Sequence, residues 1–328
     1  MTEALILLGY ALILSALAAP LLRRAAWVDR APRLAIALWQ ALTVTVLASV
    51  AMAGMALTVP TVRVSSDLAG LLRACVMALR EQYASPGGAA AGATGAVLAL
   101  GVLGRTGWCL GAAALRMERD RAAHRRVLDM VARRDDHRGV VILESAESAV
   151  YCLPGRRRRT VVTTAALRAL DDGQLAAVLA HERAHLTERH DLILSLSRAL
   201  AAAFPALRLF RDAAEETARL VELRADDVAA SRTDRLTVAG ALLAVASGSA
   251  GHAVPSVALA AGGAGAAARV RRLIPPPSPL GRAHAAVGSV AVAVLLALPL
   301  LVFGGPAAVA AQHNLCPDAT ISGYTAAG

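Results

Sequence analysis

The sequence of 328 residues contains no lysine, so all 34 of its basic residues are arginine. Charged residues make up only 18% of the chain, whereas soluble domains carry about 25%. This shortage of charge disfavours a simple soluble globule. Hydrophobic residues make up 56% and the mean hydropathy is +0.53, which excludes an intrinsically disordered chain. Four cysteines in a chain of this length exclude a disulfide-stapled scaffold.

What is present is long apolar runs together with a basic charge balance. The length allows about two domains, and we expect a membrane protein with a charged soluble part. The exclusive use of arginine and the abundance of alanine favour a bacterial source with a GC-rich genome. The formal net charge of +10 could serve to bind nucleic acid, to bind anionic lipid or to set the membrane topology.

Four segments are long and apolar enough to cross a bilayer core as helices, which takes about 20 residues. They are residues 4–22, 34–59, 89–115 and 285–310. The first segment is preceded by Glu3 and followed by Arg23 and Arg24, which reverses the charge order of a secretory signal. We therefore expect a retained span whose N-terminus lies outside the cell.

The distribution of charge predicts the topology, because positively charged loops stay in the cytoplasm. The loop 23–33 holds four arginines and one aspartate, a net charge of +3, and residues 116–285 hold 26 arginines and 19 acidic residues, a net charge of +7. The loop 60–88 and the tail after residue 310 carry little positive charge. We therefore expect a multi-pass cell-membrane protein with both termini outside and the large soluble segment in the cytoplasm.

The expected fold is a mainly α membrane protein, in which four transmembrane helices accompany a cytoplasmic α+β domain with a small sheet. The expected parts are a three-helix membrane region, the cytoplasmic domain, the fourth helix and a short extracellular tail: residues 1–115, 116–284, 285–310 and 311–328. Cys75 and Cys316 would both lie outside, where a disulfide between them is chemically allowed.

The soluble segment opens with a charged run, 116–134, that predicts a helix. Three β-rich runs then predict a small sheet with a hairpin: 140–143, 150–153 and 160–164. Asp171 or Asp172 is expected to cap the next helix, because Gln174 stands at the capping-box position. Two later helices are expected over 192–210, where Pro205 should produce a kink, and over 212–232.

The helix that follows Asp171 carries a short motif with metal-binding chemistry. Residues His181-Glu182-Arg183-Ala184-His185 have the form H-E-x-x-H. On a helix the two histidines lie about 40° apart in azimuth and about 6 Å apart in rise, so both imidazoles face one point. Glu182 lies beside them as a base for the water that a zinc ion activates. The alternative is a pair of buried histidines without metal, but three such polar groups in an alanine-rich helix need a partner.

A catalytic zinc site needs a third protein ligand. The extension that would supply a third histidine directly after the motif is missing, since Glu188 and Asp191 occupy its glycine and histidine positions. Glu222 on a later helix fits instead, and Asp226 lies one turn further on the same face. Asp226 is expected to accept the free N–H of a ligating histidine. The alternative for Glu222 is an ordinary surface glutamate.

In the order of these features, the sequence resembles the BlaR/MecR-type integral membrane zinc metallopeptidases, which are gluzincins. The HtpX-type and CAAX-prenyl endopeptidases are more distant relatives. The resemblance rests on three spans, the H-E-x-x-H motif, the Glu222-to-Asp226 element and a fourth span, and the run Tyr151 to Gly155 also looks similar. It implies one zinc ion, bound by His181, His185 and Glu222. It also implies Glu182 as general base and regulatory proteolysis of membrane-associated proteins, for example a transcriptional repressor.

The sequence departs from that family after the fourth span. The β-lactam receptors of the family carry a large extracellular sensor there, whereas only residues 311–328 follow here, so direct β-lactam sensing is not expected. One alternative function is a non-catalytic membrane receptor or scaffold that retains a structural zinc site, although a structural site has no need of Glu182. Another is a basic membrane-tethered binding module, which leaves the motif unexplained.

A few polar residues near the motif have less distinctive patterns. His190 lies about 180° around the helix from His181, so we expect it at the polar surface or on the substrate side rather than as a ligand. Tyr151 and Arg224 are candidates for stabilising an oxyanion. The run 156–159 is four arginines, and a solvated hairpin facing anionic lipid or an acidic partner is favoured over nucleic acid. The strand 150–153 is a candidate edge for pairing with substrate.

Overall fold

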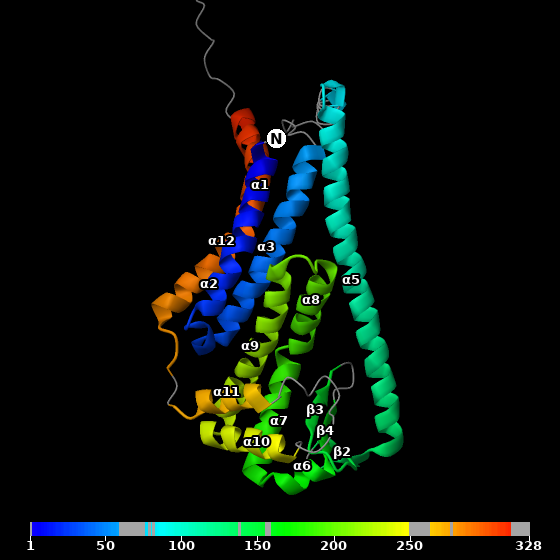
Figure 1. Cartoon of the computed structure of the whole chain (residues 1–328), viewed down its shortest axis with the longest axis vertical. Helices are drawn as coiled ribbons and strands as arrows, with labels where there is room; N and C mark the ends of the chain where they lie inside the picture. Colours follow the sequence, from blue (N-terminus) through cyan, green and yellow to red (C-terminus); the bar gives the residue numbers. More distant parts are fainter. Residues whose placement is uncertain are drawn as a thin grey trace, which may run out of the picture. The chain divides into compact units, whose positions relative to one another are not determined.

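The computed structural model describes residues 2–58, 76–77, 80, 83–136, 139–154, 159–248, 263–275 and 278–315. Several predictions concern residues outside these ranges. They are the pairing of Cys75 with Cys316, most of the loop 60–88, the basic run up to Arg158 and nearly all of the tail. The described residues are mostly helical and include one small sheet (Figure 1), which confirms the predicted fold class at that level.

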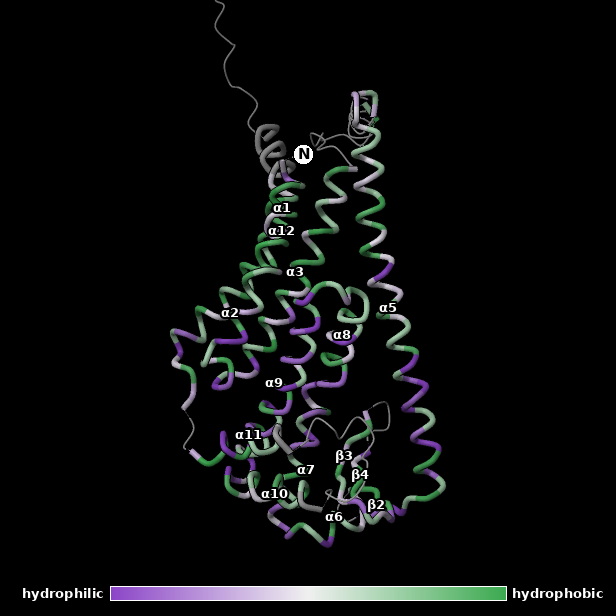
Figure 2. The backbone as a smooth tube through the Cα atoms, viewed as in Figure 1, coloured by the Kyte–Doolittle hydropathy of each residue, from purple (hydrophilic) through white to green (hydrophobic). Residues whose placement is uncertain are grey.

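Within the described residues, four helical segments are long and apolar enough to cross a membrane, and each overlaps one of the segments expected to do so. They are Thr2–Arg24, Pro32–Thr58, Gly88–Val131 and Arg282–Gly305. The first consists of α1 (Thr2–Ile13), a π-helical turn η1 (Leu14–Ala18) and α2 (Ala19–Arg24), and the others belong to α3 (Pro32–Thr58), α5 (Gly88–Val131) and α12 (Arg282–Leu315). Hydrophobic residues predominate along α1, α3 and α12 (Figure 2).

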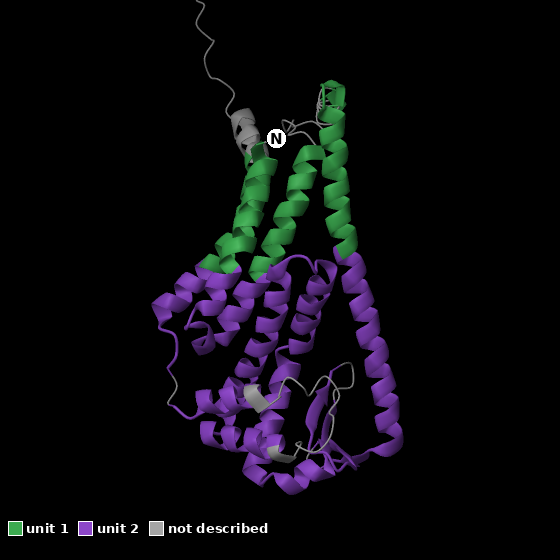
Figure 3. Ribbon diagram, viewed as in Figure 1, with its two compact units in different colours: residues 1–18, 41–105, 291–328 green, residues 19–40, 106–290 purple. Residues whose placement is uncertain are grey.

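The chain divides into two compact units (Figure 3). The first comprises residues 1–18, 41–105 and 291–328, and the second comprises 19–40 and 106–290. In the first unit α3 and α5 approach closely through glycines, since a Cβ atom added to Gly54 would lie 2.6 Å from the carbonyl oxygen of Gly95. Thr45 of α3 also donates a hydrogen bond to the carbonyl of Leu295 in α12, at 2.9 Å.

The charged helix predicted over 116–134 is not a separate element. It continues the preceding apolar segment as one helix, α5, which runs without interruption from Gly88 to Val131. The physical reason lies in the composition, because residues 112–131 contain neither glycine nor proline to end a helix. The part of α5 in the second unit is joined to the sheet by an ion pair between Asp129 and Arg159, at 2.5 Å.

The sheet of the second unit has four strands in the order β1-β2-β4-β3. The strands are β1 (Arg133–Asp135), β2 (Val140–Leu143), β3 (Val150–Leu153) and β4 (Arg159–Thr163). The predicted hairpin is confirmed as the antiparallel pair β3–β4, while β2 and β4 run parallel and β1 is an additional strand. This order leaves β3 at one edge of the sheet, next to α7.

In the part of the chain that the structure describes, six helices lie between the sheet and α12 and belong to the second unit. They are α6 (Thr164–Ala169), α7 (Asp172–Thr187), α8 (His190–Ala203), α9 (Arg208–Arg232), α10 (Arg235–Gly248) and α11 (Gly263–Leu273). The predicted cap is confirmed, with Asp171 as N-cap and Gln174 completing a capping box. Leu175 and Leu179 of α7 pack with Val162 of β4 in one buried cluster, and this contact fixes α7 against the sheet.

The apolar run 192–210 does not form the single kinked helix that was expected. Helix α8 ends at Ala203 and α9 begins at Arg208, so Pro205 lies in the turn between two helices. Proline lacks the backbone N–H that would continue a helix and clashes with the preceding turn, which explains the break. The turn lets α9 run back alongside α7 and α8.

Candidate metal centre

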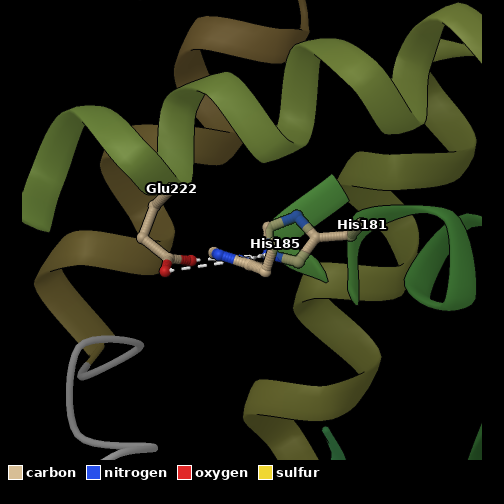
Figure 4. Close-up of side chains that lie close together, drawn as sticks. All are labelled: His181, His185 and Glu222. Carbon is tan, nitrogen blue, oxygen red and sulfur yellow. Dashed lines mark hydrogen bonds and ion pairs between the residues drawn. The ribbon is translucent and has the colours of Figure 1, made fainter. Parts of the chain in front are cut away.

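The H-E-x-x-H motif lies in the second half of α7, and its two histidines face a carboxylate on α9 (Figure 4). His181 and His185 are one turn apart on α7, and Glu222 is in the middle of α9. The two helices pack directly against each other through small side chains such as Ala177, Ala180 and Ala229, all buried. The alanine-rich composition of α7 therefore allows the close approach that brings the three side chains together.

The three side chains offer ligand atoms that all lie within 4.8 Å of one another. His181 Nε2 and His185 Nε2 are 3.1 Å apart. Glu222 Oε2 lies 3.4 Å from His181 Nε2, and Glu222 Oε1 lies 3.7 Å from His185 Nε2. Tetrahedral ligands at zinc distances of about 2.0–2.1 Å are separated by about 3.3 Å. Two imidazole nitrogens and one carboxylate oxygen with this spacing are a donor set that fits zinc.

The electrostatic environment of these residues favours a positive charge at their centre. Burial alone would lower the pKa of His181, but its contacts with Asp226 and Glu222 outweigh burial and raise the pKa to about 9. Burial lowers the pKa of His185 to about 4, which keeps its imidazole neutral and able to bind a metal. The same carboxylates that stabilise a proton on His181 would stabilise a metal cation.

Asp226 lies where the sequence predicted it, behind His181. Its side chain is 0% exposed, and Oδ1 lies 3.0 Å from His181 Nδ1. A carboxylate at this position orients a ligating imidazole and fixes its tautomer. The sequence did not predict the next group: Arg269 of α11 donates to both oxygens of Asp226, at 2.8 and 2.6 Å, and its Nη1 lies 3.0 Å from Glu222 Oε2.

Glu182 faces the edge strand of the sheet. Its Oε2 accepts a hydrogen bond from the backbone N–H of Cys152 in β3, at 3.1 Å. Burial raises the pKa of Glu182 to about 7, opposed by the neighbouring His181. A carboxylate with a pKa near neutrality is suited to accept and return a proton during catalysis. The candidate base therefore lies between the histidine pair and the strand proposed to receive substrate.

The expected position of His190 at the polar surface is wrong. Helix α7 ends at Thr187, Arg189 adopts a left-handed conformation with φ 52° and ψ 43°, and His190 begins α8. The helical azimuth that placed it far from His181 therefore does not apply. His190 is only 1% exposed, and its Nδ1 lies 3.0 Å from Nδ1 of His185.

The two candidates for stabilising an oxyanion have other partners. The Tyr151 hydroxyl lies 2.9 Å from Nε2 of His124 in α5. Arg224 donates to both carboxylate oxygens of Glu188, at distances of 2.5 to 3.0 Å. Both polar groups thus already contact side chains outside the group of His181, His185 and Glu222.

The sequence comparisons point to the same part of the chain. Residues 115–222 match the model of Peptidase family M48, a family of zinc metallopeptidases. The match covers about a third of the chain, includes His181 to His185 and ends at Glu222. No curated protein and no solved structure matches the chain significantly. Residues 115–222 are therefore similar to a gluzincin-type M48 peptidase domain.

Proposed function

We propose that this protein is a membrane-embedded, zinc-dependent endopeptidase that cleaves protein substrates at the cytoplasmic face of a bacterial cell membrane. The observation that carries the proposal is the grouping of His181, His185 and Glu222 with Glu182 beside them. The match of residues 115–222 to Peptidase family M48 supports the same reaction class.

His181, His185 and Glu222 would hold the zinc ion, with Asp226 fixing the orientation of His181. Zinc in this position would supply Lewis-acid chemistry, which polarises a carbonyl group and makes water more acidic. Glu182 accepts a proton from the attacking water and delivers it to the nitrogen of the leaving amine, so the proton is conserved over the reaction.

The edge strand β3 would bind the substrate backbone. Among the described residues it pairs with β4 on one side only, and Cys152 in this strand contacts Glu182. An extended peptide added to a sheet edge gains backbone hydrogen bonds without depending on its side chains. The strand would thereby place a peptide bond of the substrate beside the base.

The proposed location rests on the four long apolar helices and on the charge distribution. The loop 23–33 and the segment 116–285 have net charges of +3 and +7, and positive loops favour the cytoplasm. Both termini would then lie outside. A substrate in or near the membrane follows, and a regulatory protein such as a transcriptional repressor fits the resemblance to the BlaR/MecR type.

Chelation of zinc should abolish cleavage. Purified full-length protein in detergent would be incubated with membrane and soluble proteins of the host cell, and new protein N-termini would be counted by mass spectrometry. We expect cleavage in the zinc-loaded protein, loss after treatment with a chelator, and recovery when zinc is returned. Magnesium added in place of zinc is the control and should not restore cleavage, because it prefers oxygen ligands in octahedral geometry.

The same experiment separates the peptidase from its main rival, a receptor or scaffold with a structural zinc site. A protein that binds zinc but produces no new N-termini would support the rival. The position of Glu182 favours the peptidase, because a buried carboxylate with a raised pKa has a cost that a structural site need not bear.

A further inference from the structure

The second histidine of the motif has a polar partner that the proposed reaction does not use. His185 directs Nε2 towards His181 and Glu222, and its other nitrogen, Nδ1, lies 3.0 Å from Nδ1 of His190. The two rings meet edge to face, with centroids 4.9 Å apart and an interplanar angle of 83°. His190 therefore lies behind His185, on the side away from the other ligand atoms.

Two further side chains, Glu188 and Arg224, continue the row of contacts that begins at His190, and both are partly exposed. Its Nε2 lies 3.3 Å from Oε2 of Glu188, and Glu188 in turn accepts hydrogen bonds from Arg224 of α9. Arg224 lowers the pKa of Glu188, so this carboxylate stays ionised. The three side chains form a continuous row from α8, through the end of α7, to α9.

The positions of the protons along this row follow from the chemistry of imidazole. An imidazole that binds metal through Nε2 carries its proton on Nδ1. His185 must then donate from Nδ1, which requires His190 Nδ1 to be an acceptor. A neutral His190 with an acceptor at Nδ1 carries its proton on Nε2, where ionised Glu188 accepts it. One tautomer of each histidine satisfies every contact.

The other histidine of the motif has a similar set of contacts. His181 contacts Asp226, which accepts hydrogen bonds from Arg269. His185 contacts His190, which contacts Glu188, and Glu188 accepts hydrogen bonds from Arg224. Each ligand histidine is thus connected to a carboxylate that an arginine fixes in place. The second row is one residue longer because His190 fills the distance between His185 and Glu188.

We propose that His190 is a positioning residue for the metal centre. It accepts a hydrogen bond from the Nδ1–H group of His185 and is itself oriented by the Glu188–Arg224 ion pair. The proposal rests on the proposed function, since it needs His185 to be a zinc ligand. The left-handed backbone conformation of Arg189 makes the contact between His190 and His185 possible. It ends α7 and turns His190 back towards His185, which a continuous helix would not do.

Zinc affinity of the full-length protein tests this role directly. His190→Leu removes the acceptor and should weaken zinc binding about 10- to 100-fold, the usual effect of losing such a group. His190→Asn places an amide oxygen near the position of Nδ1 and should restore most of the affinity. His190→Gln places its amide near Nε2 instead, so it should resemble His190→Leu while remaining polar if the leucine variant fails to fold.

Two readouts distinguish positioning from simple structural support. Zinc dissociation constants would be measured by competition with a chromophoric chelator, and cobalt would replace zinc so that its visible absorption reports ligand geometry. We expect His190→Leu to alter the cobalt spectrum and His190→Asn to keep it close to wild type. His124→Leu is the matched control, because His124 contacts Tyr151 rather than a predicted ligand, and it should leave both readouts unchanged.

The outcomes separate this inference from the proposed function. Zinc binding by wild type with unchanged affinity and spectrum in His190→Leu would overturn the role of His190 and leave the peptidase proposal standing. Equal losses in the leucine and asparagine variants would also overturn it, because the acceptor would then be irrelevant. If wild type binds no zinc, the proposed function fails first, and the role of His190 fails with it.

Discussion

Replacing Glu182 with glutamine is expected to lower substrate cleavage by about 100- to 10,000-fold, the usual contribution of general acid–base catalysis. Glutamine has nearly the same shape as glutamate but cannot accept a proton from water. Its amide oxygen can still accept the hydrogen bond from the backbone N–H of Cys152, so the local structure should persist. Zinc content should therefore stay at the wild-type value while cleavage is lost.

The measurement compares initial rates of cleavage of one identified substrate by both proteins, at matched zinc content. Glu144→Gln is a suitable control, because Glu144 is an exposed residue after β2 and lies outside the candidate centre. It should cleave at the wild-type rate. Equal rates for Glu182→Gln and wild type would show that another group moves the proton.

Replacing Arg269 with methionine is expected to destabilise the zinc-free protein by about 3–5 kcal/mol, the typical cost of breaking a buried ion pair. Arg269 is 6% exposed and contacts two carboxylates, Asp226 and Glu222. Methionine fills a similar volume but leaves the buried charge of Asp226 without its strongest partner. The loss should appear as a lower melting temperature of the second unit.

Thermal unfolding of the zinc-free protein in detergent, followed by circular dichroism, measures this effect. Arg271→Met is the matched control, because Arg271 is exposed on the same helix, two residues away. Surface substitutions of this kind usually change stability by less than about 0.5 kcal/mol. Identical melting temperatures for the two variants would contradict the role assigned to Arg269.

The sequence was sufficient for the elements that depend on local patterns. The spacing of His181 and His185 follows from helical geometry, and Asp171 with Gln174 marked the start of their helix. Glu222 and Asp226 were found because they are one turn apart and carry chemistry that the motif lacked. In each case a short stretch of chain contains the pattern on which the prediction rests.

The sequence was insufficient where the structure depends on a single backbone conformation or on distant packing. Nothing marked Arg189 as left-handed, since arginine is not a residue that favours that region, and so His190 was assigned to the wrong helix. Arg269 stands close to Arg271 and Arg272 in the sequence. Only the packing of α11 decides which of the three faces Asp226.

In the sheet, too, the part that depends on neighbouring residues was predictable and the part that depends on distant residues was not. Two β-rich runs and a turn predicted the β3–β4 hairpin, whereas the parallel pairing of β2 with β4 depends on residues some twenty positions apart. That pairing places β3 at the edge, where Cys152 meets Glu182. Local patterns therefore could not predict the contact between the candidate base and the edge strand.

The central claim is that His181, His185 and Glu222 together bind one zinc ion, and the zinc content of purified protein tests it most directly. Metal analysis should find about one zinc per chain in wild type, an unchanged value in His124→Ala, and a value close to zero in His185→Ala after dialysis. A wild-type protein without zinc, or a His185→Ala protein that keeps it with wild-type affinity, would contradict the claim.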